Sequence, residues 1–255
     1  MYPRRILLKI LRDVWHIKGR AIIIIVITAV SVSIYVGTHT ALHSIEQTAL
    51  QLYADHHLAD LQINFIPTTE DELPPFSSEI PGIHRMEQRL ILPGSIETND
   101  DKLVASLSIF LDSDQRQEVN QLKIIEGTYL APDRDDAVLL DYSFARDFGY
   151  QVGDIIMLGL QGFFAEYEII GLAVNPEFLI ATASPDLYIP IKGSLGIVYA
   201  SMDAIENLFG YNIYNNLSVT FAAGADPEEV KHRLEEAFLS QEIEIDSELF
   251  QEDLY

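Results

Sequence analysis

The chain has 255 residues, no cysteine, and 39 acidic against 16 basic residues, which gives a formal net charge of −23 at pH 7. The missing cysteines exclude disulfides, thiolate catalysis and zinc–thiolate sites. The acidic balance argues against nucleic-acid binding and against adhesion to an anionic bilayer surface, because both need a basic footprint. A chain of this length can bury an adequate core without disulfides.

The most informative stretch lies near the N-terminus, where no Lys, Arg, Asp or Glu occurs between Arg20 and Glu46. A bilayer core of about 30 Å needs about 20 predominantly apolar residues in a helix. The alternatives are a buried core helix and the apolar region of a cleaved signal peptide, which usually has only about 7 to 15 residues. The longer run here favours a retained membrane helix over residues 21–45.

The residues before this helix orient it. Residues 1–20 carry six positive charges against one negative charge, Asp13, and their apolar residues recur at helical spacing. We expect a cytoplasmic basic amphipathic helix over 1–20, bent from the spanning helix at Gly19, although a plain basic flank would need only the charges. Residues 46–255 then form an extracytoplasmic domain on the outer side of the plasma membrane.

The domain contains a mixed series of expected elements. The helical pattern continues from residue 46 to Tyr53, and Pro67 is expected to end the first strand. Strands are predicted over 59–65, 89–93, 103–111, 137–140, 155–158, 163–170, 196–200 and 217–221. Helices are predicted over 142–148, through Phe209 after a cap at Ser201, and from 227 onward. This order is not a strict βαβ alternation, so it favours an α+β fold with a mainly antiparallel sheet.

Two helices carry clear boundary signals. Asp141 precedes the helix over 142–148, and Gly149 follows it. Asp226 stands at the cap of the last helix, Pro227 at its first position, and Glu229 completes a predicted capping box.

Motifs for catalysis or nucleotide binding are missing. The sequence has no G-x-S-x-G elbow, no G-x-x-x-x-G-K-[ST] loop and no G-x-G-x-x-G after a strand. We therefore assign no catalytic residue and no cofactor-binding residue, and we predict that the chain is not an enzyme.

Two groups of side chains invite a metal interpretation. One is the histidine pair His39 and His43, followed by residues 55–60 with two histidines and two aspartates. The other is the acidic turn over 133–136, which lacks the ligand spacing of an EF-hand loop. Membrane-boundary polarity and a solvated acidic turn are the simpler interpretations, so we assign no metal site.

Several short motifs follow one another in a recognisable order. They are 80–84 (IPGIH), 125–130 (IEGTYL), 136–140 (DAVLL), 144–149 (FARDFG), 152–156 (VGDII), 169–171 (IIG) and 175–178 (NPEF). Together with the basic start and the single apolar helix, this order resembles the N-terminal half-unit of FtsX/MacB-type ABC transporter permeases, in particular the long two-unit members. Thr128 stands where that family usually has Arg.

The resemblance implies a MacB-like periplasmic core domain and a non-catalytic permease component. Such permeases pair with a separate cytoplasmic ATPase, work as dimers or two-unit chains, and in some members contact a membrane-fusion or other extracytoplasmic partner. They couple ATP hydrolysis to export, extraction or mechanotransmission. Because later membrane helices are missing, we expect the natural chain to continue. The alternative is a single-span anchored binding or sensor domain.

Overall fold

The computed structural model describes residues 18–75, 80–98, 102–132, 134–178 and 193–250. Contacts divide the chain into two compact units, Met1–Gln51 and Leu52–Tyr255. The predicted amphipathic helix over 1–20 falls mostly on residues 1–17, which lie outside the described residues.

The first unit consists of most of α2 (Lys18–Asp55), a continuous helix of 38 residues and about 57 Å. Its stretch Lys18–Ser44 is long and apolar enough to cross a membrane. The hydroxyls of Thr28 and Ser31 donate to the carbonyls of Ile24 and Ile27, each at 2.8 Å, so neither is left unpaired in an apolar environment. The predicted helical continuation to Tyr53 is confirmed.

The second unit begins with an antiparallel sheet, hereafter the first sheet. Its order is β10 (Ile245–Phe250), β1 (Leu61–Thr69), β9 (Ile213–Phe221) and the first half of β2 (Ile83–Glu97). The prediction that Pro67 ends the first strand is wrong. β1 continues past it, because the pairing with β9 is interrupted between Asn64 and Thr68, where a residue without an N–H can be accommodated. The residues that follow β1 form a short 3₁₀ helix, η1 (Glu70–Glu72).

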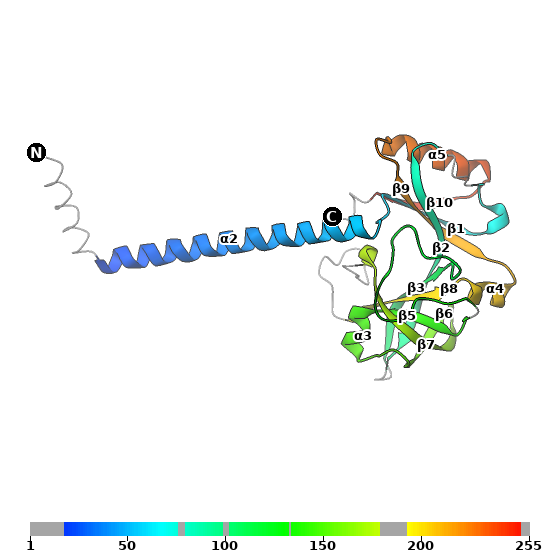
Figure 1. Cartoon of the computed structure of the whole chain (residues 1–255), viewed down its shortest axis with the longest axis horizontal. Helices are drawn as coiled ribbons and strands as arrows, with labels where there is room; N and C mark the ends of the chain where they lie inside the picture. The colour runs from blue at the N-terminus through cyan, green and yellow to red at the C-terminus, as the bar shows by residue number, and fades with distance from the viewer. Residues whose placement is uncertain (1–17, 76–79, 99–101, 133, 179–192, 251–255) are drawn as a thin grey trace, which may run out of the picture. The chain divides into compact units, whose positions relative to one another are not determined.

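Helix α5 (Pro227–Ser240) covers one face of the first sheet, as Figure 1 shows. The Asp226 carboxylate accepts a hydrogen bond from the N–H of Glu228, which confirms the predicted cap. Glu229 instead pairs with Arg233. The apolar stripe packs against the strands through buried side chains, namely Val230, Leu234 and Phe238 of α5 and Leu61, Ile63, Phe65, Leu217 and Val219 of the sheet.

The second half of β2 belongs to a closed ring of six strands, hereafter the barrel. From β2 the ring runs through β3 (Leu103–Leu111), β8 (Leu195–Ser201), β5 (Ala137–Asp141), β7 (Phe163–Val174) and β6 (Ile155–Leu160), which pairs with β2 again. One buried cluster contains side chains from all six strands, including Ile96, Val138, Ile169 and Val198, so it fills the barrel interior. Figure 1 shows the barrel strands grouped beside the first sheet.

Shorter elements complete the barrel. They are β4 (Lys123–Gly127), which pairs with β7, the helices α3 (Tyr142–Phe148) and α4 (Asp203–Phe209), and the 3₁₀ helix η2 (Pro176–Phe178). The predicted boundaries of α3 are confirmed, because Asp141 accepts from the N–H of Phe144 at 2.9 Å and Gly149 is left-handed at φ 79°. Ser201 is not the cap position of α4, which is Met202, although its hydroxyl accepts from the N–H of Asp203.

The α+β prediction is confirmed. Among the described residues, every strand pair is antiparallel except β3 with β8 and β5 with β7. One strand, β2, is shared by the first sheet and the barrel, so the two parts are joined by continuous backbone at its midpoint.

Candidate functional site

Arg89 lies at the point where β2 passes from the first sheet to the barrel. It forms the last pair with β9, opposite Asn216, and the next residue, Leu90, begins the pairing with β3. The side chain of Asn215 extends the junction by one residue, since its amide accepts from the N–H of Ile91 and donates to the carbonyl of the same residue. Along β2, the pairing with β9 therefore passes directly into the pairing with β3, and no residue at the midpoint is left without a strand partner.

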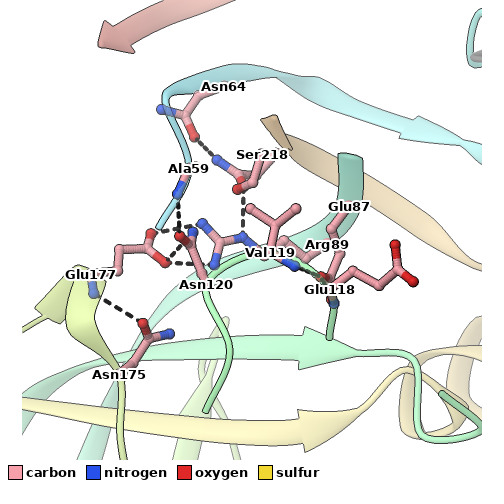
Figure 2. A network of polar contacts seen from close by, with 11 residues as sticks. Ala59, Asn64, Glu87, Arg89, Glu118, Val119, Asn120, Asn175, Glu177 and Ser218 are labelled. Atoms are coloured by element: carbon pink, nitrogen blue, oxygen red, sulfur yellow. Dashed lines mark hydrogen bonds and ion pairs between the residues drawn. The ribbon is translucent and has the colours of Figure 1, made fainter. Parts of the chain in front are cut away.

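The Arg89 side chain is only 1 % exposed and makes three short hydrogen bonds. Nε donates to Oδ1 of Asn216 at 2.7 Å, and the two terminal nitrogens donate to the two carboxylate oxygens of Glu177 at 2.6 and 2.7 Å. Burial alone would lower the pKa of Arg89, but the neighbouring Glu177 carboxylate outweighs burial and raises that pKa above its usual value. Glu177 lies in η2, directly after barrel strand β7, so the ion pair ties the first sheet to the barrel (Figure 2).

Asn120 connects this ion pair to the segment that follows α2. The residue is fully buried, and its backbone is left-handed at φ 51°. Its amide nitrogen donates to Glu177 at 3.0 Å, while its amide oxygen accepts from the N–H of Ala59 at 2.7 Å. The backbone N–H of Asn120 also donates to the carbonyl of His57 at 2.9 Å.

A second pair of contacts reinforces this attachment. The N–H of Gln121 donates to the carbonyl of His56 at 2.8 Å, and Nδ1 of His56 lies 2.9 Å from the carbonyl oxygen of Gln121. Residues 56–59, which directly follow α2 in the sequence, are therefore held by residues 120 and 121 through four polar contacts.

The loop carrying Asn120 is itself held on β2 by a carboxylate. Oε2 of Glu87 accepts from the N–H of Glu118 at 3.0 Å and from the N–H of Val119 at 3.1 Å. Burial raises the pKa of Glu87 to about 7, although both backbone donors and the charge of Arg89 act in the opposite direction. A cavity of about 440 Å³ lies beside this carboxyl group, and Tyr214 lines its wall.

The polar bonding continues across the first sheet. The amide nitrogen of Asn216 donates to Asn64 of β1 at 2.7 Å, and the hydroxyl of Ser218 donates to Asn216 at 3.2 Å. Asn175 accepts from the N–H of Glu177 and fixes the turn that presents it. We call Arg89, Glu177, Asn120, Asn216 and Glu87 the junction cluster.

The chemistry of the junction cluster is structural. Its charged and amide groups are directed at one another and at backbone N–H groups, and no hydroxyl, thiol or imidazole stands among its five side chains. Buried ion pairs whose partners are fully hydrogen-bonded resist separation, because removing one partner strands the other charge. The cluster is therefore suited to holding three chain segments in a fixed relation.

The metal candidates read from the sequence do not come together. Among the residues that the structure describes, no group of three or more His, Asp or Glu could hold a metal ion. The Nδ1 atom of His56 lies against Gln121, and the carboxylate of Asp60 accepts from the N–H of Phe221 at 2.6 Å.

The acidic turn over 133–136 also forms no metal site among its described residues. Asp133 lies outside the described residues. Asp135 accepts from Asn207 at 3.1 Å, and Asp136 pairs with Arg134 at 2.6 Å. These two carboxylates therefore take part in protein contacts.

Sequence reasoning missed the junction cluster, because its members are far apart in the chain. One signal was available, since Glu177 is part of the NPEF segment that carried the family resemblance.

The sequence comparison decides the family. The MacB-like periplasmic core domain matches residues 21–237. The chain belongs to this family. The match begins within α2 and ends within α5, so it includes the whole junction cluster. The resemblance to MacB/FtsX-like permeases is thereby confirmed.

Solved structures give two further comparisons. The periplasmic region of MacB from Actinobacillus actinomycetemcomitans is 12 % identical, with 81 % of this chain and 95 % of that chain covered and a TM-score of 0.49. The extracellular domain of the noncanonic ABC-type transporter YknZ from Gram-positive bacteria is 13 % identical, with 74 % of this chain and all of that chain covered and a TM-score of 0.45. No curated protein matches the chain.

Proposed function

We propose that the chain is the membrane-helix and extracytoplasmic part of an ABC transporter permease, without enzymatic activity of its own. The observation that carries this proposal is the match to the MacB-like periplasmic core domain, which runs from within α2 through most of the α+β domain. A cytoplasmic ATPase hydrolyses ATP, and this chain couples that hydrolysis to export, extraction or mechanotransmission across the membrane.

The junction cluster gives the coupling a physical route. α2 runs without interruption to Asp55, and residues 56–59 are bonded to Asn120 and Gln121. Asn120 is bonded to Glu177, which in turn is paired with Arg89. A displacement delivered at the end of α2 therefore acts on both the first sheet and the barrel through hydrogen bonds that are buried from water.

The strand register supports a paired arrangement of membrane helices. Leu61, at the start of β1, pairs with Phe250, at the end of β10. The start of β1, which follows the segment after α2, and the end of β10 therefore lie side by side. This is the geometry expected of a permease unit in which two membrane helices carry the domain between them, in a dimer or a two-unit chain.

The orientation follows from the charges. Six basic residues against one acidic residue before residue 21 support a cytoplasmic N-terminus in a plasma-membrane protein. The proposed parts are a basic amphipathic helix over 1–20, a transmembrane helix over 21–45 and an extracytoplasmic domain over 46–255. The partners are the lipid bilayer, a cytoplasmic ABC ATPase and a membrane-fusion or other extracytoplasmic protein.

Affinity purification of the natural full-length protein from its own membranes tests the proposal. We expect an ABC-type ATPase to co-purify in a fixed ratio, and its ATPase rate in nanodiscs to depend on the permease. A purified protein with no ATPase partner, whose domain binds a small ligand by itself, would favour the anchored binding or sensor domain instead.

A further inference from the structure

One carboxylate controls the loop to which the segment after α2 is bonded. Oε2 of Glu87 accepts from two successive backbone N–H groups, those of Glu118 and Val119. Val119 is 1 % exposed, and the next residue is Asn120, whose side chain holds the N–H of Ala59. The state of one side chain on β2 therefore bears directly on the bonding of residues 56–59.

Protons can reach this carboxylate. Glu87 lines the cavity of about 440 Å³, whose wall also includes the exposed side chains of Asp112, Arg116 and Glu118. The ionisable groups around it come from several segments. They are Arg89 on β2, Asp112, Arg116 and Glu118 on the loop after β3, Tyr129 before β5, and Tyr214 on β9. Near the same loop, His57 interacts electrostatically with Arg85, His84 and Glu118.

We propose that Glu87 is a proton-operated latch that sets how tightly the loop over 117–121, and with it the segment after α2, is held on the first sheet. Ionised Glu87 makes two charge-assisted hydrogen bonds to the loop. Protonated Glu87 keeps a carbonyl oxygen for these N–H groups, but the bonds become neutral and weaker. The inference goes beyond the proposed function, because it concerns the attachment of the loop over 117–121 to the first sheet and needs neither cargo nor ATPase.

Glu87 titrates near neutral pH. Burial raises the pKa of Glu87 to about 7, so small changes of extracytoplasmic pH change its charge. The local and global consequences have opposite signs. Lowering the pH weakens the two bonds to the loop, yet it relieves the cost of a buried charge and stabilises the domain as a whole. Because the two effects have opposite signs, weaker binding of the loop at low pH can be distinguished from a general loss of domain stability.

The test uses the full chain in lipid nanodiscs. Amide NMR shifts of Glu118 and Val119 should titrate together with a midpoint near 7. The protection of the Ala59 amide against hydrogen exchange, corrected for the intrinsic rate, should fall about fivefold from pH 8 to pH 6, as expected when a charge-assisted bond becomes neutral.

Two variants complete the design. Glu87→Gln imitates the neutral acid, so the Ala59 protection should be low and independent of pH. Asp154→Asn removes another carboxylate that accepts a backbone N–H, that of Gln151, and should leave the titration unchanged. If Glu87→Gln does not fold, the wild-type measurements decide alone. Ala59 protection that stays constant between pH 8 and 6, or that still falls in a folded Glu87→Gln protein, overturns the proposal.

Discussion

Replacing Arg89 with methionine removes the centre of the junction cluster while keeping a long side chain in the same space. Three hydrogen bonds are lost, one to Asn216 and two to Glu177. The Glu177 carboxylate, only 7 % exposed, is left with Asn120 as its remaining side-chain donor in the cluster. The variant thus creates a buried carboxylate without a counter-charge.

The expected cost is about 3–5 kcal/mol, the usual effect of removing one partner from a buried ion pair. For a unit of roughly 200 residues, each kcal/mol lowers the thermal midpoint by about 2–4 °C, so the midpoint should fall by about 10 °C. The change in far-ultraviolet circular dichroism of the full chain in detergent follows this transition. The surface variant Arg134→Met, whose ion pairs are exposed, should change the midpoint little.

A double-mutant cycle separates the pair from general packing. Glu177→Gln alone should also destabilise the domain, because it leaves the Arg89 charge unmatched. The double variant Arg89→Met with Glu177→Gln should be less destabilised than the sum of the single variants by about 2 kcal/mol. Additive effects would refute the reasoning that the two side chains act as one unit.

Three other predictions concern stability. The pKa of Glu87 is raised to about 7, so the folded domain binds a proton more tightly than the unfolded chain. The contribution of Glu87 to the free energy of unfolding should fall by up to about 3 kcal/mol as the pH rises from 4.5 to 7, and the difference between the wild-type and Glu87→Gln profiles isolates this contribution. Gly127→Ala should destabilise by more than about 1 kcal/mol in urea unfolding, because φ is 79° and a new Cβ would lie 2.2 Å from the carbonyl oxygen of Ile170. Asp141→Ala should cost about 1 kcal/mol by losing the cap on Phe144, and an unchanged urea midpoint would contradict that role.

Elements with local signals could be predicted from the sequence. The helix α3 lies between Asp141 and Gly149, a cap and a left-handed stop that act within one turn. Asp226 and Pro227 define the start of α5 in the same way. Pro67 shows the limit of such signals, because its effect depends on whether its position in the strand needs an N–H, and the interrupted pairing removes that need.

The junction cluster could not be predicted, because it depends on contacts across long separations. Arg89 and Glu177 are 88 positions apart. The alternation of β1, with Leu61 and Ile63 on one face, predicts a solvent-facing polar side for the other residues. In the fold Gln62 on this side is buried and Asn64 is half-buried, whereas Ile66 is exposed. Strand alternation identifies the two faces but cannot say which other segments cover them.

The central claim is that motion of α2 enters the domain through residues 56–59 and the junction cluster. The most direct measurement is hydrogen exchange of the reconstituted permease–ATPase complex with and without a trapped ATP analogue. The account predicts that nucleotide changes the exchange of the Ala59 and Asn120 amides, and that a flexible Gly-Ser insertion near Thr48 abolishes this change while the ATPase stays bound. The account would be contradicted if nucleotide did not change the exchange of these amides. It would also be contradicted if the change were equally large in the protein with the Gly-Ser insertion.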